Sequence, residues 1–194
     1  MKKINQILLA ILVIAFAMPT LQSCKKGEND PMLSLKSRKA RLTGEWKLSE
    51  GTVTELEGTG STTTVYTETM KTETELGETP AITPYTETIT IEKDGTFEST
   101  NVSGTSIYTL KGVWFWAEGN KELETGDKEV LVLSITSITT AGGVSTYTGF
   151  GDSNQQFLKI DKLSGKEMII TIEESSSSTG SVSSKTGTKT YIQE

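Results

Sequence analysis

Side chains capable of covalent chemistry are scarce in this sequence. The chain of 194 residues has no histidine and one cysteine, Cys24. Nucleophilic catalysis usually pairs a nucleophile with a base such as histidine, and zinc sites usually use cysteine and histidine ligands. We find no nucleophile–base pair, no glycine-rich phosphate loop and no supported pair of acids. We therefore predict a protein that is not an enzyme and that uses no metal and no cofactor.

Cys24 is the residue with the clearest chemical role. A positive start, Lys2-Lys3, precedes an unbroken apolar run over residues 7–18. This layout is typical of a secretory signal peptide, and the run is shorter than the roughly 20 apolar residues of a membrane-spanning helix. Leu21-Gln22-Ser23-Cys24 resembles the lipobox at which lipoprotein signal peptidase cuts before a cysteine. We predict that residues 1–23 are a lipoprotein signal peptide and that the Cys24 thiol carries the lipid.

The predicted anchor also indicates the compartment and the class of partner. Stable membrane attachment needs more than one acyl chain, and bacterial lipoproteins of this kind carry two or three, palmitate among them. We expect a location in the cell envelope, anchored to the outer membrane. The formal charge is −6, and loss of Lys2 and Lys3 with the signal changes it to −8, so nucleic acid is not an expected partner. The basic stretch over residues 25–41 is either a docking site for anionic headgroups or a solvated tether.

After the tether, residues 24–31, the sequence predicts a short helix. Asp30-Pro31 is typical of a helix start, with an N-cap aspartate and a proline in the first turn. The helix is expected over residues 32–42, and Gly44 ends it.

From Gly44 onward, alternation of polar and apolar residues predicts strands joined by turns. Tyr85, Ile89 and Ile91 share one face of a strand, and Asp94-Gly95 is a hairpin turn signal. The other segments that we interpret as strands are residues 46–48, 65–70, 96–98, 107–117, 128–136, 144–150, 155–163, 166–173 and 190–192. Residues 175–189 are rich in serine, threonine and glycine, and we predict a long mobile loop there. Some eight to ten short strands with one helix predict a sandwich or a barrel, and closure is favoured because it removes exposed edge strands.

Leu42-Thr43-Gly44-Glu45-Trp46-Lys47-Leu48 resembles the opening of lipocalin-like domains, in which a short helix leads into a Gly-x-Trp first strand. The segments at 94–97, 110–114 and 160–170 match in order and spacing. The chain thus resembles the small lipocalin-like lipoproteins of Gram-negative anaerobes, most of which have no assigned function. The resemblance implies an all-β fold: an antiparallel up-and-down β-barrel of about eight strands, formed by residues 32–194, with a short N-terminal helix.

The candidate binding residues are apolar and aromatic. We expect the following side chains in the barrel interior: Trp46, Tyr108, Trp114, Trp116, Leu131 and Leu133. They either line a cavity for a small hydrophobic ligand or fill the core, because an eight-stranded barrel is only just wide enough for its own side chains. With a filled core, the protein would be an interaction module that docks another envelope protein. Four acids, Glu68, Glu73, Glu75 and Glu78, have oxygen ligands suited to calcium, but their spacing favours a solvated hairpin.

Overall fold

The computed structural model describes residues 29–31, 36–119, 129–147, 154–178 and 181–194. The described part contains a short helix followed by eleven strands. In chain order they are α2 (Arg38–Leu42), β1 (Gly44–Glu57), β2 (Gly60–Thr67), β3 (Met70–Glu75), β4 (Ala81–Ile91), β5 (Thr96–Ser103), β6 (Ser106–Trp116), β7 (Val130–Thr140), β8 (Gly143–Thr146), β9 (Gln155–Leu163), β10 (Glu167–Ser178) and β11 (Ser181–Gln193).

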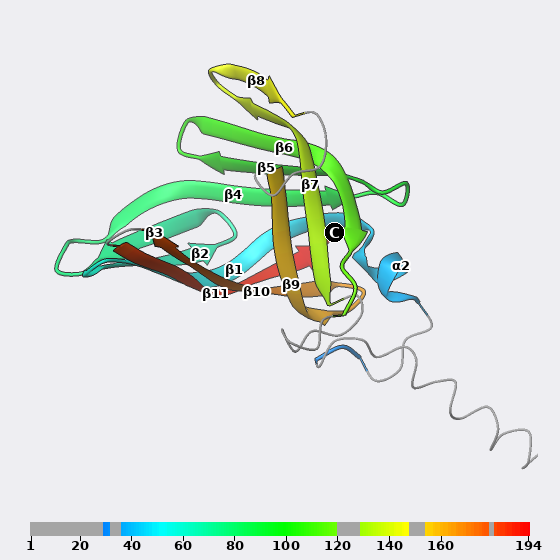
Figure 1. Ribbon diagram of the computed structural model, residues 1–194, viewed down its shortest axis with the longest axis horizontal. Helices are drawn as coiled ribbons and strands as arrows, with labels where there is room; N and C mark the ends of the chain where they lie inside the picture. Colours follow the sequence, from blue (N-terminus) through cyan, green and yellow to red (C-terminus); the bar gives the residue numbers. More distant parts are fainter. Residues whose placement is uncertain (1–28, 32–35, 120–128, 148–153, 179–180) are drawn as a thin grey trace, which may run out of the picture.

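The strands close into an antiparallel barrel (Figure 1). From β1 to β7 each strand pairs with the next along the chain, β7 then pairs with β9, and β11 returns to pair with β1. Strand β8 lies outside the ring, and within the described residues it pairs only with the last residues of β7. The prediction of an all-β fold with a closed antiparallel barrel is confirmed.

The barrel has ten strands where the sequence predicted about eight. The difference arises because the hairpin β2–β3 is inserted between β1 and β4 along only part of their length. Residues Gly44–Lys47 of β1 pair directly with β4, whereas Glu50–Glu57 pair with β2. The first residues of β4 likewise pair with β3. The barrel therefore has a narrow end, where β1 meets β4, and a wide end, where β2 and β3 separate them.

The prediction of a long mobile loop over residues 175–189 is wrong. Strand β10 continues to Ser178, β11 begins at Ser181, and the two pair from Glu167 opposite Ile192 to Ser178 opposite Ser181. Strand β11 also pairs along β1, so backbone hydrogen bonds hold it on both sides. Backbone hydrogen bonds between strands do not require apolar side chains. A segment that is poor in apolar residues can therefore form strands, although its composition predicts a loop.

Two local predictions also need revision. Residues 65–70 are not one strand: β2 ends at Thr67 and β3 begins at Met70, and the Thr67 hydroxyl bonds to the Met70 backbone across the turn. The described helix is shorter than predicted and takes Ser37 as its N-cap, with the Ser37 Oγ accepting from the Ala40 N–H. Residues 32–35, the start of the predicted helix, lie outside the described residues.

The turn predicted at Asp94-Gly95 is present between β4 and β5. The Asp94 carboxylate accepts hydrogen bonds from the backbone N–H and hydroxyl of Thr96 at 2.9 and 2.7 Å. Gly95 has φ +96°, a backbone conformation that side chains with a Cβ rarely adopt. The local sequence therefore accounts for this hairpin.

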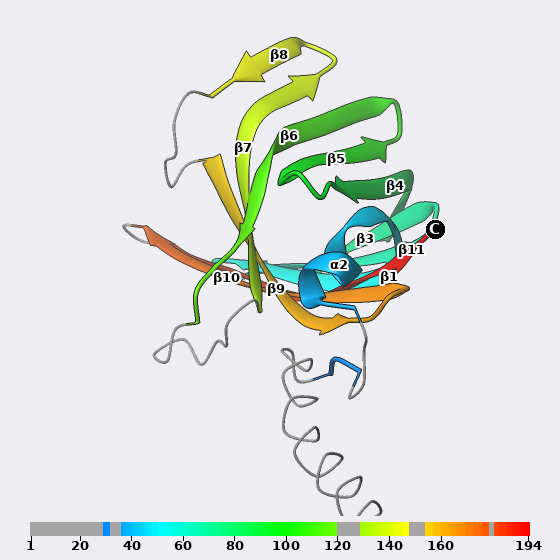
Figure 2. The same ribbon diagram turned by 90° about the vertical axis from the view of Figure 1, so that its right-hand side faces the viewer.

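Helix α2 lies across the narrow end of the barrel (Figure 2), where it contacts β9. Leu42 is fully buried, and the two arginines of α2 are almost fully buried. Burial of two guanidinium groups demands a counter-ion and hydrogen-bond acceptors.

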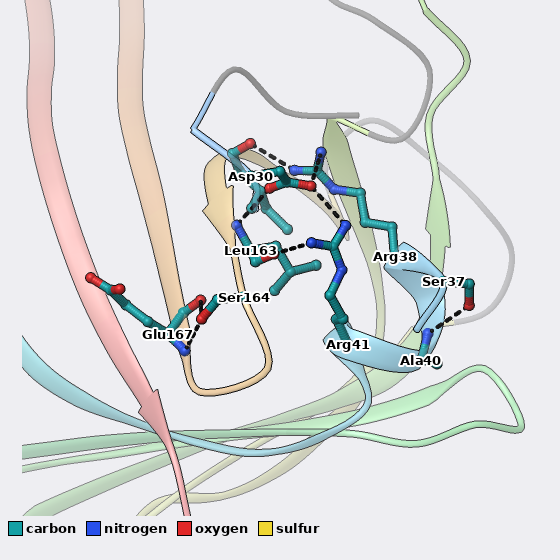
Figure 3. Close-up of polar contacts among 9 residues, drawn as sticks. Asp30, Ser37, Arg38, Ala40, Arg41, Leu163, Ser164 and Glu167 are labelled. Carbon is teal, nitrogen blue, oxygen red and sulfur yellow. Dashed lines mark hydrogen bonds and ion pairs between the residues drawn. The ribbon is translucent and has the colours of Figure 1, made fainter. Parts of the chain in front are cut away.

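Asp30 supplies the counter-ion (Figure 3). Its Oδ2 lies 3.2 Å from Arg38 Nη1 and 2.9 Å from Arg41 Nη2, and its Oδ1 accepts from the Leu163 N–H at 2.8 Å. The arginines donate to the backbone carbonyls of Ile160 and Leu163 at 3.0 and 2.7 Å. This cluster fastens the segment before α2, the helix itself and the end of β9 to one another.

The apolar core fills the barrel from the narrow end inward. Its buried side chains are Leu42, Trp46, Leu48, Tyr85, Ile89, Ile91, Phe97, Leu110, Trp114, Leu131, Leu133, Ile135, Ile160, Leu163, Met168, Ile170 and Tyr191. They come from α2 and from every strand of the ring except β2 and β3, and the predicted inward face of Tyr85, Ile89 and Ile91 is confirmed.

Candidate ligand-binding cavity

A cavity of about 830 Å³ occupies the barrel interior away from α2. Part of its wall is apolar, formed by Val53, Ile89, Leu110, Leu133, Ile170 and Ile172. Four tyrosines add aromatic surface: Tyr66, Tyr85, Tyr108 and Tyr191. The insertion of β2–β3 widens the ring at this end, so the interior side chains do not fill the space inside it.

The cavity reaches the surface between β9 and β10. Pairing of these strands stops at Thr171 opposite Lys159, and the later residues of β10 pair only with β11. Consecutive residues of both strands, 155–158 and 172–175, border the cavity. Since neighbouring residues of a strand point to opposite faces, a wall that includes both faces indicates an opening at the strand edges.

Glu87 is the polar centre of the cavity wall. Its Oε1 accepts a hydrogen bond from the Tyr191 hydroxyl at 2.6 Å. Its Oε2 accepts from the Tyr85 hydroxyl at 2.7 Å and from Lys189 Nζ at 2.6 Å. The side chains of Glu87 and Lys189 are 11% and 15% exposed, so this ion pair is largely removed from water.

Strand geometry explains why these four side chains converge. Tyr85 and Glu87 are two residues apart on β4, and Lys189 and Tyr191 are two residues apart on β11. Side chains two apart on a strand share a face, so each pair projects into the barrel. Strand β1 lies between β4 and β11 at the narrow end. The Tyr85/Glu87 pair and the Lys189/Tyr191 pair meet on the interior side of β1.

Lys189 also lies against aromatic rings. Its Nζ is 4.7 Å from the Tyr66 ring centroid and 6.0 Å from that of Tyr85. The two rings are in contact, with centroids 5.2 Å apart and planes tilted by 56°. Ring faces attract cations, so Tyr66 and Tyr85 help to hold the ammonium group beside Glu87.

The cluster has a defined ionisation state. Burial by itself favours the neutral acid, but Lys189 and the hydrogen bonds from Lys189, Tyr191 and Tyr85 hold the pKa of Glu87 below its ordinary value of 4.5. Burial and the Glu87 charge raise the pKa of Tyr85 and of Tyr191 above their ordinary value of 10. At neutral pH the cavity wall therefore holds a carboxylate and neutral phenols that donate to it.

The six side chains expected in the barrel interior divide between two places. Tyr108 and Leu133 line the cavity. The other four, Trp46, Trp114, Trp116 and Leu131, do not border it and lie toward the narrow end.

The tryptophans at the narrow end are held by α2 and by nearby backbone. Trp46, fully buried, donates from its indole N–H to the Leu42 carbonyl at 2.7 Å. Trp114 donates to the Glu92 carbonyl at 2.9 Å. Arg38 lies 5.6 Å from the ring centroid of Trp116. These contacts hold the three indole rings in the packed region around α2.

Sequence reasoning missed Glu87 and Lys189, the charged centre of the site. A signal was present for Glu87, because it falls between Tyr85 and Ile89 on a face that is otherwise apolar. A charged residue on a buried strand face needs a partner and so marks a candidate site. Lys189 carried no such signal, since it lay in the segment predicted as a loop.

The remaining predicted sites are Cys24 and the acidic cluster. Cys24 and the signal peptide fall outside the described residues, so lipidation stays a prediction. Glu73 and Glu75 lie on β3, where the Glu73 carboxylate pairs with Lys71 at 3.0 Å. Among the described residues no group of three or more metal-ligating side chains occurs.

The part of the chain that the structure describes has no helix of the length and apolarity needed to cross a membrane. Comparison with known proteins returned no match: no family model, curated protein or solved structure is significantly similar to this chain.

Proposed function

We propose that this protein is a lipid-anchored binding protein of the cell envelope, with a lipocalin-like domain that holds a small hydrophobic molecule inside the barrel. The observation that carries the proposal is the cavity of about 830 Å³ with its mixed wall of apolar, aromatic and convergent polar groups. Small-molecule sites typically measure roughly 300–1,000 Å³ and combine an apolar lining with a few placed polar groups. The alternative of a filled barrel that acts only by docking another protein does not account for this space.

The place of the proposed anchor suits such a role. Cys24 precedes Asp30 by six residues, which span at most about 20 Å when fully extended. Asp30 is held at the narrow end by Arg38 and Arg41. The narrow end would therefore lie nearest the outer membrane, and the cavity would open toward the aqueous side.

A cavity-filling substitution tests the proposal. Ser99 borders the cavity on β5, whereas its neighbour Thr100 does not. In the predicted mature chain carrying Cys24→Ser, we expect Ser99→Trp to weaken binding of an apolar fluorescent probe by at least about tenfold, because the indole occupies the cavity. Thr100→Trp adds the same group to the opposite face of the strand and should change the affinity by less than about twofold.

Two results would count against the proposal. One is a parent chain that does not bind the probe, and the other is a Ser99→Trp variant with parental affinity. Thermal unfolding of both variants, followed by circular dichroism, separates a blocked cavity from an unfolded barrel.

A further inference from the structure

The Lys189 ammonium retains hydrogen-bonding capacity inside the cavity. An ammonium group has three N–H donors, and one of them binds Glu87 Oε2 at 2.6 Å. Within the described residues it makes no other hydrogen bond, and it lies beside the faces of Tyr66 and Tyr85. Lys189 borders the cavity, so an entering molecule can accept a hydrogen bond from it.

Glu87 has the opposite character, because its oxygens are already engaged. It accepts three hydrogen bonds, from Tyr85, Lys189 and Tyr191. Its negative charge balances the positive charge of Lys189 at 2.6 Å. The polar centre of the cavity therefore offers a donor without offering a net positive charge.

The other charged side chains of the cavity wall do not give the wall a net positive charge. Glu173, Glu174 and Lys185 border the cavity, and the two glutamates are exposed. Together with the Glu87–Lys189 pair they leave the wall with more acids than bases, and the whole chain has a formal charge of −6. Lys185 makes no ion pair within the described residues, but it lies opposite Glu174 on β10 and Glu55 on β1, so acids flank it on both neighbouring strands.

The cost of burying charge then selects between ligands. A carboxylate placed beside Lys189 would bring a second negative charge next to Glu87 in a site largely removed from water, and an unbalanced buried charge is strongly unfavourable. The carbonyl oxygen of an ester or amide accepts the same hydrogen bond and adds no charge. Hydrogen bonds to a charged donor are stronger than neutral ones, so the neutral acceptor still gains affinity.

We infer that the cavity takes an uncharged amphiphile, an apolar chain with one carbonyl-type oxygen that accepts from Lys189 Nζ, and that Glu87 is a built-in counter-ion that excludes the corresponding carboxylate. This inference rests on the proposed binding function and names the ligand class for the same cavity. Lys189 and Glu87 are thereby assigned as specificity-determining residues.

The test compares methyl decanoate with decanoate as competitors of the apolar probe at neutral pH. In Glu87→Gln the Lys189 charge loses its counter-ion. We expect the ratio of the decanoate Kd to the methyl decanoate Kd to fall by at least about tenfold relative to the parent chain. Comparing this Kd ratio between variants cancels the difference in water solubility between methyl decanoate and decanoate.

Glu98→Gln is the matched control. Glu98 is an exposed residue of β5 that pairs with Lys111 at 2.8 Å and does not border the cavity. The substitution makes the same change in net charge, so its Kd ratio should equal that of the parent chain. A ratio in Glu87→Gln that matches the parent and the control would overturn the inference while leaving probe binding intact. Failure of both competitors to displace the probe from any variant would instead count against the proposed binding function.

A second variant keeps the test decisive if Glu87→Gln does not fold. Glu87→Gln combined with Lys189→Met replaces the ion pair by uncharged groups, an exchange that buried pairs often tolerate. Decane, which has no acceptor, is the reference. We expect the affinity advantage of methyl decanoate over decane to shrink about tenfold in the double variant, because the Lys189 donor is gone. An unchanged advantage would overturn the assignment of Lys189.

Discussion

The two ends of the barrel each bury an ion cluster, and the two clusters differ in what their donors bind. At the narrow end, the side chains of Asp30, Arg38 and Arg41 are at most 1% exposed, and the arginines donate to backbone carbonyls of β9. At the wide end, Glu87 and Lys189 are slightly more exposed and border a cavity. The comparison teaches that the donors of a buried charge are occupied by the fold where backbone surrounds them, and stay accessible to an entering molecule where space remains beside them.

Packing follows the same division. Strand β7 carries Leu131 and, two residues further on, Leu133; both belong to the buried core cluster, and Leu133 also borders the cavity. Both belong to one face of one strand. The difference in their surroundings comes from the ring around them, which gains β2 and β3 toward the wide end.

The largest effect is expected from Asp30→Asn. The amide keeps the shape of the side chain but cannot balance two buried guanidinium groups, so we expect a loss of about 3–5 kcal/mol in the free energy of unfolding. Urea denaturation measures it. Glu98→Gln breaks an exposed ion pair and should cost less than about 1 kcal/mol. A loss below about 1 kcal/mol for Asp30→Asn would remove the structural role that we assign to the narrow-end cluster.

A pair of leucine substitutions on β7 compares packing at the two ends directly. Leu131→Ala should cost about 2–5 kcal/mol of unfolding free energy, because it leaves a cavity in a filled region. Leu133→Ala should cost less, since the Leu133 side chain already has open space on one side. Both variants are measured by urea denaturation, and equal costs would argue against the division into a packed and an open end. Probe binding should change only in Leu133→Ala.

The smallest effect concerns acid stability at the wide end. The pKa of Glu87 is held below its ordinary value of 4.5, so its ionised form stabilises the fold. This contribution is complete above about pH 4.5 and is lost as the pH falls through the lowered pKa. The parent chain should therefore lose more stability than Glu87→Gln when the pH is lowered from about 5 to about 3. Melting temperatures across this pH range measure the difference. The control Glu98→Gln should show the same pH dependence as the parent chain. The same pH dependence of the melting temperature in the parent chain and in Glu87→Gln would contradict the ionised state of Glu87.

Much of the fold could be predicted from local pattern. Alternation placed Tyr85, Ile89 and Ile91 on an inward face, and Asp94-Gly95 predicted a hairpin turn that the structure contains. The inserted hairpin β2–β3 could not be predicted, because its threonine- and glutamate-rich strands have little apolar alternation. Its pairing with β1 and β4 is a property of the assembled sheet.

The candidate site was less accessible to sequence reasoning. Tyr108 and Leu133 were expected inside the barrel, and they do border the cavity. The charged centre joins Glu87 to Lys189 and Tyr191, which lie more than 100 residues away along the chain. Nothing local in a segment of serine, threonine and glycine marks Lys189 as inward-facing.

The sequence by itself determined the class of fold, since alternating strands without a second helix must pair and closure removes their exposed edges. It also determined which kinds of chemistry lack the residues they need, because the chain has no histidine and one cysteine. Only the tertiary structure decided where the barrel is filled and where it is hollow. That outcome depends on how many strands encircle each level of the barrel, and on a register that brings Glu87 and Lys189 together across the interior.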